Sequence, residues 1–567
     1  MIKEQYLTPG ARLTPPASPG MVALAAAPTF ARRDPERTLT RHLRSFLAVA
    51  LAGVLTAAAA WAQPAPAPAD LPLAATPAAV AAVPVAVAAP GPAPEFAVVQ
   101  LSAAARATAS TVSGYAVDPS GARSSSDPQQ SSRLSLRADL DTGERWGPWS
   151  VKGRLGGDVA TGTFAGKPTL QGDQLPGSRF DNALVTDAWA GIALKNLLEV
   201  RAGVMASHWG MGLIAHDGGQ AFDARRNDWF SLPTLVDRVA RAMLIVQPFG
   251  RQASSLRGLI LAAAADRVIE DPTGSRAAND TANQGLFAAR WYAAHNQWTG
   301  LYYVYRDQTY ATGRFLHAHV IDATFDFDFS HDGHGLRLQG EGAAILGTTS
   351  LAPTADFAQH DVRQGAFVGR ARYDMRPIRF ELDAGWLSGD DQLDNGSLSA
   401  FKANPNYQQG ILLFSQVLAT QSGRARGTAS NLQYMGQPAQ DLDHLATGGS
   451  VTSAVTVFPK MGWKCSDLLE VYGGALFAFA PAIPIDPFTT TTSGGGQPRN
   501  FLGKAPTSSQ LGTEIDLGVA TTLATTLPLL LQVRAEYAVL LPGGALTGLD
   551  SPIHGGRLTL ALVPPVH

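Results

Sequence analysis

The sequence is poor in cysteine and in charge. Its 567 residues include one cysteine, Cys465, and only 16% are charged. One thiol excludes an internal disulfide framework, a cysteine-rich zinc module and a thiolate-held iron–sulfur cluster. A formal net charge of −2 lacks the basic excess of nucleic-acid-binding proteins, so we expect no nucleic acid partner. Walker, dinucleotide-binding and HExxH motifs are absent from the sequence, and we therefore expect no cofactor.

Long apolar runs are also scarce, and the clearest lies near the N-terminus. The run from Phe46 to Ala60 follows a basic segment at 41–44 and closes on small residues around Ala62. That order is typical of a secretory signal peptide, whereas about fifteen apolar residues are too few to anchor comfortably as a membrane span. We predict an extended N-terminus with a signal peptide over 1–62, cleaved after Ala62.

Proline interrupts the next segment so often that no helix would survive. Residues 63–96 consist almost entirely of alanine, proline and valine. This composition predicts a disordered or polyproline-like linker in the periplasm. The rest of the chain, 97–567, is predicted to form one domain.

In that domain, polar and apolar residues alternate with a period of two, which indicates β-strands. A soluble β-sandwich also alternates, but a transmembrane barrel needs strands of about 9–11 residues with an apolar outside and a polar inside. Aromatic residues cluster on single strands, as they do in the girdles at a membrane interface: Phe325, Phe327 and Phe329 on one, and Trp298, Tyr302, Tyr303 and Tyr305 on another. We therefore expect a barrel in the outer membrane of a Gram-negative bacterium.

Eight hairpins with short turns can be traced, and they give sixteen strands. They pair 133–141 with 149–160, 183–194 with 198–206, 236–246 with 255–268, 284–294 with 297–306, 314–329 with 335–346, 362–374 with 376–388, 450–459 with 467–480, and 511–522 with 527–541. A strand at 556–563 must return to the periplasm, and parity then requires an opening strand at 97–116. We predict an antiparallel up-and-down barrel of about eighteen strands, and sixteen stays open because the opening strand has little amphipathic contrast.

Three stretches carry a family resemblance. They are the strand tip Ala384 to Asp391, the segment Phe401 to Phe414, and the closing hairpin from Leu511 to Gly543. Together they resemble the alginate-export-like outer-membrane barrels, a porin-like family with eighteen strands. The resemblance implies a conduit for an anionic polysaccharide, with a lumen lined by arginine and lysine.

The faces that we expect to point into the lumen carry both signs of charge. Mixed signs are typical of the transverse field of a general diffusion porin, or of a salt-bridge lattice that plugs the lumen. The candidate pore-lining residues are Arg133, Arg137, Asp139, Lys152, Arg154, Asp158, Arg370, Arg372, Asp374, Arg379, Glu381, Asp383, Glu514, Asp516, Arg534 and Glu536.

Two further patterns could indicate a catalytic site or a metal site. Ser207 and His208, with His216 and Asp217, suggest a hydrolase, but adjacent strand residues point to opposite faces. We therefore expect no enzyme and interpret the segment as a strand end entering a loop, with Trp209 at the lipid interface. A second pattern, formed by Asp390, Asp391 and Asp394, is a weak Ca²⁺ candidate, for which a solvated loop is the favoured interpretation.

The longest predicted loop, 389–449, either folds inward as a constriction or presents an extracellular surface. Its apolar patch from Ile411 to Val417 favours folding inward. We predict a passive channel for small hydrophilic or anionic solutes, inserted into outer-membrane lipid by the barrel-assembly machinery. The alternative is a plugged barrel that acts as a structural or surface-interaction protein through its loops.

Overall fold

The structure is a computed structural model that describes residues 98–143, 147–163, 179–218, 228–233, 236–251, 255–294, 297–329, 334–354, 356–392, 395–429, 446–525 and 529–564. The predicted signal peptide and linker lie outside the described residues. So does Asp394 of the weak Ca²⁺ candidate.

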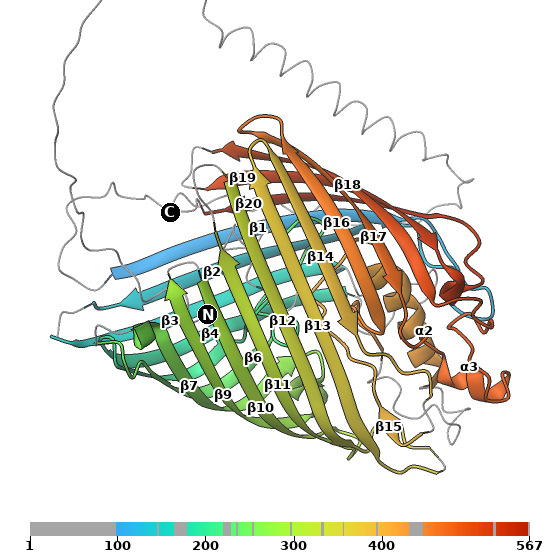
Figure 1. Cartoon of the computed structure of the whole chain (residues 1–567), viewed down its shortest axis with the longest axis horizontal. Coiled ribbons are helices and arrows are strands. Elements are labelled where there is room, and N and C mark those ends of the chain that lie inside the picture. The colour runs from blue at the N-terminus through green and yellow to red at the C-terminus, as the bar shows by residue number, and fades with distance from the viewer. Residues whose placement is uncertain are drawn as a thin grey trace, which may run out of the picture. The chain divides into compact units, whose positions relative to one another are not determined.

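One antiparallel sheet closes on itself to form a barrel (Figure 1). In the described part of the chain the sheet has twenty strands, of which β8 (Gly274–Ser275) and β15 (Ser397–Leu398) have two residues each and do not cross the barrel. The remaining eighteen pair antiparallel, and β20 pairs with β1, with Leu562 opposite Ala105. The prediction of eighteen strands is confirmed, and the sixteen-strand alternative was wrong because the Ala-rich opening strand does form.

The eighteen strands match the predicted ones to within a few residues. They are β1 (Val98–Val112), β2 (Gln129–Asp141), β3 (Trp149–Thr163), β4 (Arg179–Leu194), β5 (Leu198–Ala206), β6 (Arg238–Val246), β7 (Leu259–Asp271), β9 (Thr281–Ala294), β10 (Gln297–Thr309), β11 (Phe315–Asp328), β12 (His334–Thr349), β13 (His360–Met375), β14 (Ile378–Leu387), β16 (Ala454–Lys464), β17 (Leu469–Phe479), β18 (Gln510–Ala524), β19 (Leu530–Pro542) and β20 (Ile553–Val563).

Alternation along each strand separates an apolar outer face from a polar inner one. On β2, Leu134 and Leu136 are 43% and 53% exposed, whereas the intervening Ser135 is 2% exposed. Large apolar side chains are exposed in this way on strands all around the wall. Such a surface is stable in a bilayer and would be an association liability in water. The chain therefore forms a porin-like barrel of the outer membrane.

The prediction that aromatic residues form girdles at the membrane interface was right for the outward residues and wrong for two others. Tyr303, Tyr305 and Phe329 are exposed on the outer surface. Trp298 and Tyr302 occupy the opposite register of β10 and are buried in the barrel interior.

Among the described residues, no helix is long and apolar enough to cross a membrane.

The α-helices are short and lie at one end of the barrel. The π-helical turn η5 (Leu413–Leu418) continues into α2 (Ala419–Ala429), and α3 (Pro487–Thr492) lies at the same end as α2 and β15 (Figure 1). The single-turn 3-10 segments are η3 (Ser255–Gly258), η4 (Arg276–Ala278) and η8 (Gly544–Leu546). Cys465 lies in the exposed turn between β16 and β17, as predicted.

Candidate functional site

Two loop segments fold into the barrel and narrow its lumen. The first lumen segment consists of residues 207–218 and 228–233, which follow β5, and the second consists of residues 395–429, which follow β14. In the second, every residue from Ile411 to Val417 is buried. The prediction that the apolar patch folds inward is therefore confirmed for the described part of 389–449.

A glutamate of the barrel wall holds the second lumen segment. Glu514 of β18 is fully buried, and its carboxylate accepts hydrogen bonds from the backbone N–H groups of Leu412 and Leu413 at 2.7 and 2.8 Å and from that of Ile411. These amides lie at the N-terminal end of η5 and lack strand partners, so the carboxylate satisfies donors that burial would otherwise leave unpaired. Gly410 has φ +72°, and a Cβ there would lie 2.8 Å from Glu514 Oε1. Glycine therefore permits the close approach.

Two more wall glutamates hold the first lumen segment in the same way. Glu341 of β12 accepts hydrogen bonds from the backbone N–H groups of Met211 and Leu213, the latter at 3.2 Å. Glu536 of β19 accepts one from Phe230 N–H at 3.2 Å. Leu232 N–H also donates to Gln408 Oε1 of the second segment at 2.7 Å. The two lumen segments are therefore fixed to the wall and to each other.

Aromatic packing fills the space between the first lumen segment and the wall. Trp229 stacks on Tyr472 of β17, with ring centroids 5.4 Å apart. Trp209 stacks on Tyr302 at 5.0 Å and donates from Nε1 to Asp322 Oδ1 at 2.8 Å. The prediction that Trp209 lies at the lipid interface was wrong, because the chain turns into the lumen after β5 and buries the indole there.

Beside these rings, the wall carries a balanced group of charges that we call the wall charge cluster. Arg370 donates to Asp383 at 2.7 Å, Arg372 donates to Glu381 at 2.9 Å, and the Lys460 ammonium lies 2.8 Å from Asp383. Lys460 also binds Glu381. Asp228 of the first lumen segment reaches Arg370 at 2.7 Å. Burial alone would raise the pKa of Asp228, but the guanidiniums of Arg370 and Arg372 outweigh burial and lower that pKa.

We expect Lys460→Met to destabilise the barrel strongly. Its side chain is 1% exposed and balances two buried carboxylates, so its loss would leave Glu381 and Asp383 undercompensated. Removing one partner of a buried ion pair costs about 3–5 kcal/mol. Heat-induced mobility shifts in detergent gels would measure the effect. The matched control is Lys464→Met, because the Lys464 side chain is 55% exposed and pairs only across a turn. Equal stability of the two variants would contradict this account.

A second group of charges, the arginine cluster, is positive rather than balanced. It consists of Arg106 on β1, Arg133 on β2, Arg534 on β19 and Arg557 on β20. Arg106 and Arg133 are direct cross-strand neighbours, and the other two guanidiniums lie within electrostatic range of Arg106. Like charges placed opposite each other destabilise a sheet, so this arrangement calls for a compensating anion.

Only two of these four guanidiniums are bonded to carboxylates. Arg133 binds Asp158, and Arg557 donates to Glu536 Oε2 at 2.8 Å. Arg106 instead donates to the carbonyl oxygen of Pro233 at 2.8 Å. Of the residues that the structure describes, no carboxylate lies within salt-bridge distance of Arg106 or Arg534.

A buried hydroxyl lies in the same register as the arginine cluster. Thr559 of β20 is opposite Arg534 on one side and Thr108 on the other, and it is 5% exposed. Within the described part of the chain, its Oγ1 has no hydrogen-bond partner. Two guanidiniums without a direct carboxylate partner among the described residues, and a hydroxyl beside them, form a constellation that suits a carboxylate-bearing solute.

The other predicted pore-lining residues also lie on the inner face, most of them in ion pairs. Asp139 pairs with Arg137 at 2.9 Å and with Arg154 at 2.5 Å, Lys152 pairs with Glu199 at 3.4 Å, and Arg379 pairs with Asp374 at 2.7 Å. Asp516 is fully buried beside Glu514. The arrangement is closer to a salt-bridge lattice than to a field across an open pore.

Asp390 serves a turn, and the weak Ca²⁺ prediction finds no support around it. The carboxylate of Asp390 accepts hydrogen bonds from the backbone N–H groups of Gln392 at 3.0 Å and Ser399 at 2.9 Å. Asp391 is exposed. Neither belongs to a metal-binding arrangement among the described residues.

Sequence reasoning missed several residues that the lumen uses. Arg106 lies on the Ala-rich strand β1, and Lys460 follows a proline within β16. Arg557 and Glu341 occupy inward positions of β20 and β12. Strict application of the period-two rule to these strands would have marked all four as inward charges.

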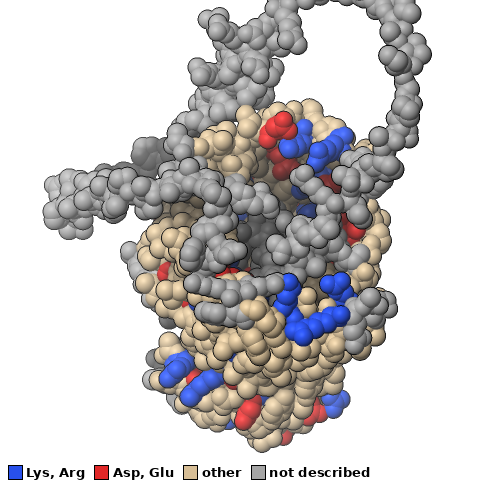
Figure 2. Space-filling view, turned by 90° about the vertical axis from the view of Figure 1, so that its left-hand side faces the viewer, with Lys and Arg blue, Asp and Glu red and all other residues tan. Residues whose placement is uncertain are grey.

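The end of the barrel where β1 begins carries both basic and acidic side chains (Figure 2).

Of three comparisons with known proteins, the one with solved structures gives matches. No protein-family model matches the chain. No curated protein matches it either. Among solved structures, Pseudomonas aeruginosa OccK11 (OpdR) is 13% identical with a TM-score of 0.44, and the match covers 83% of this chain and 96% of that one. Acinetobacter baumannii OccAB1 is 10% identical with a TM-score of 0.45, covering 82% and 96%. Pseudomonas aeruginosa OccK2 (OpdF), in complex with glucuronate, is 11% identical with a TM-score of 0.44, covering 82% and 97%.

Proposed function

We propose that this protein is a passive outer-membrane channel that favours small anionic hydrophilic solutes. The observation that carries the proposal is the arginine cluster. Its members Arg106 and Arg534 lie on the inner face of the wall and have no carboxylate partner among the described residues. Arginine is always charged and binds carboxylates with fixed geometry. A monocarboxylate in the lumen would supply a negative charge near the guanidiniums of Arg106 and Arg534.

The two lumen segments set the size limit of this channel. An eighteen-stranded barrel is wide enough for an aqueous pore unless loops fill it. Here the segments bury Phe401, Tyr407 and Phe414 in one apolar core with the wall. That narrowing supports small solutes over bulky ones.

Uptake into proteoliposomes tests the proposal. We would compare the entry of glucuronate, the ligand in the OccK2 structure, with that of glucosamine, a cation of similar size. A guanidinium charge about 16 Å away lowers the energy of an anion by about 1 kcal/mol at an effective dielectric of 20 and raises that of a cation by the same amount, so entry rates should differ by about thirtyfold in favour of glucuronate. Equal rates would contradict anion preference.

The resemblance to alginate-export-like barrels extends the proposal to polymers of uronic acids. The same arginine cluster would attract their carboxylates. Entry of uronic acid oligomers of increasing length, measured in the same vesicles, tests this extension. A cutoff at the monomer would restrict the channel to small solutes.

A plugged barrel that acts through its loops is the second candidate. It is favoured by the continuity of the apolar core, which joins both lumen segments to the wall. Absence of uptake for every solute, from a barrel shown to be folded, would select this candidate over the channel.

We further propose that the chain is not a hydrolase. Ser207 Oγ accepts a hydrogen bond from Arg241 Nη2 at 3.0 Å, and a guanidinium cannot remove a proton from a nucleophile. The proposal also includes contact with outer-membrane lipid and insertion by the barrel-assembly machinery. Its support is the outward pair Leu558 and Leu560 on the last strand, both exposed.

A further inference from the structure

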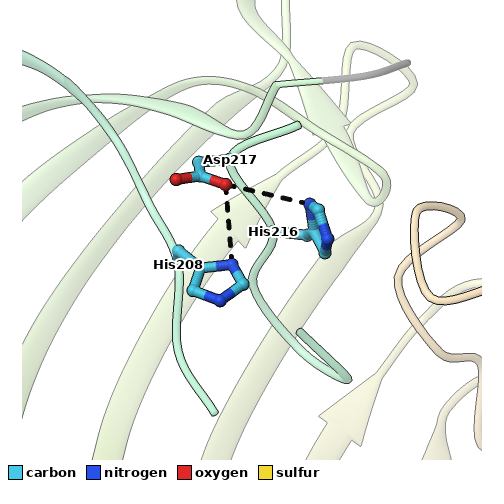
Figure 3. A group of neighbouring side chains, drawn as sticks. All are labelled: His208, His216 and Asp217. Carbon is cyan, nitrogen blue, oxygen red and sulfur yellow. Dashed lines mark ion pairs between the residues drawn. The ribbon is translucent and has the colours of Figure 1, made fainter. Parts of the chain in front are cut away.

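The first lumen segment begins with a tight hairpin that places two histidines beside one aspartate. Ser207 N–H donates to Asp237 O at 3.0 Å, and Trp209 N–H donates to Ala215 O at 3.1 Å. The chain reverses between Trp209 and Ala215, so His208 and the pair His216 and Asp217 lie on opposite arms of this hairpin (Figure 3). Residues eight and nine positions apart are thereby brought together.

The three side chains converge at distances typical of ligands around one ion. His208 Nδ1 lies 3.6 Å and His216 Nδ1 lies 4.0 Å from Asp217 Oδ1, and both rings turn toward that carboxylate (Figure 3). Their potential ligand atoms all lie within 4.8 Å of one another. These separations are too long for direct hydrogen bonds. Two ligands of one tetrahedral ion with bonds of about 2.05 Å lie roughly 3.3 Å apart, so a small contraction would complete the site.

The surroundings are buried and rich in carboxylates. The side chains of His208, His216 and Asp217 are 15%, 7% and 11% exposed. Asp187 of β4 is 6% exposed and within electrostatic range of Asp217, and, among the described residues, its Oδ1 has no hydrogen-bond partner. Asp237 Oδ2 accepts a hydrogen bond from His216 N–H at 2.9 Å, so a third carboxylate lies beside this residue.

We propose that His208, His216 and Asp217 bind a divalent transition-metal ion such as Zn²⁺. Two imidazoles and one carboxylate suit Zn²⁺, Cu²⁺ or Ni²⁺, whereas Ca²⁺ and Mg²⁺ prefer oxygen ligands. The proposal does not depend on the proposed channel function.

The hairpin holds its potential ligands in place without an ion. Gly218 N–H donates to His216 Nδ1 at 2.9 Å, so that nitrogen carries a lone pair rather than a proton. A bound ion would replace the Gly218 amide as its partner. Gly212 has φ +86°, and a Cβ there would lie 2.4 Å from His216 Cδ2, so glycine is required beside the ring. Glu341 fixes the tip of the same hairpin through Leu213 N–H.

Metal binding to the purified full-length barrel in detergent tests the proposal. The protein would carry no polyhistidine tag and would contain Cys465→Ser, because that exposed thiol is itself a potential ligand. After treatment with a chelator, we expect one equivalent of Zn²⁺ to bind with a dissociation constant in the micromolar range or below. Co²⁺ at the same site should give visible absorption bands typical of nitrogen and oxygen ligands.

Three single variants and one matched control locate the binding. His208→Ala, His216→Ala and Asp217→Asn should each weaken Zn²⁺ binding by at least about tenfold. His317→Ala is the control, because His317 and Asp307 form an exposed pair with a 3.1 Å separation away from the hairpin. Heat-induced mobility shifts would verify that each variant is folded. Stoichiometric binding that survives the double variant His208→Ala plus His216→Ala would overturn the proposal, as would failure of the folded parent protein to bind Zn²⁺.

Discussion

Replacing Glu514 by glutamine is expected to free the second lumen segment and raise single-channel conductance. The carboxylate accepts hydrogen bonds from three consecutive backbone amides, at Ile411, Leu412 and Leu413. Glutamine keeps the size but loses the charge and turns an N–H₂ group toward one of those donors. Hydrogen bonds to charged groups contribute about 1.5–3 kcal/mol each, so about 3 kcal/mol or more of attachment would be lost.

Planar-bilayer recordings would measure this effect as larger or noisier open steps. Because an eighteen-stranded lumen conducts when loops do not fill it, replacing Ile411 to Leu418 by a glycine–serine linker should raise conductance by roughly twofold or more. The control is Glu270→Gln, since the Glu270 side chain is 43% exposed and pairs with Arg238. Conductance in Glu514→Gln identical to that of the parent, with unchanged protease resistance of 411–418, would contradict the role given to Glu514.

Removing Arg106 and Arg534 together is expected to abolish most of the anion preference. These two guanidiniums donate to the carbonyl oxygens of Pro233 and Asp228, at 2.8 and 3.3 Å. A carbonyl oxygen carries no formal charge, so both positive charges can still attract an anion in the lumen. By the same Coulomb scale, each guanidinium lowers the energy of a nearby anion and raises that of a cation by about 1 kcal/mol, so removing one should lower the permeability ratio of anion to cation by about thirtyfold and removing both by more.

Reversal potentials in a salt gradient would measure that ratio in the double variant Arg106→Ala plus Arg534→Ala. Arg363→Ala is the control, because the Arg363 side chain is 69% exposed and pairs with Asp361 outside the lumen. Screening by salt should shrink the difference at high ionic strength. An unchanged ratio in the double variant, or an equal fall in the control, would place the selectivity elsewhere.

The barrel could be predicted from sequence because its strands are local patterns. Alternation in β2 or β14 depends only on neighbouring residues, and closing the sheet then requires an even number of strands. Even the weak strand β1 followed from parity. The same alternation identifies the inward charges. It also holds for Lys460 and Arg557, which were missing from the predicted pore-lining residues.

The lumen could not be predicted in the same way because its contacts are distant in sequence. Glu514 binds amides about one hundred positions earlier, and Phe230 N–H reaches Glu536 across a separation of 306 residues. Nothing local marks a wall glutamate as a partner for a loop. The apolar patch from Ile411 to Val417 indicated inward folding, but not where it would bind.

The segment after β5 shows what a local rule could and could not predict. The interpretation of 207–212 as a strand end entering a loop was right, but the accompanying predictions placed Ser207 and His208 on opposite faces and Trp209 at the lipid interface. The strand ends at Ala206, and positive φ values at Gly210 and Gly212 turn the chain inward. The glycines were visible in the sequence, and they now explain both the buried indole and the meeting of His208 with Asp217.

The central claim is an anion-favouring pore that passes between the lumen segments and the barrel wall. Its most direct test is the current through single molecules of the purified chain in a planar bilayer with a salt gradient. We predict stable open steps and a reversal potential on the anion-selective side. Cation selectivity, or silence from a barrel shown to be folded, would contradict the account.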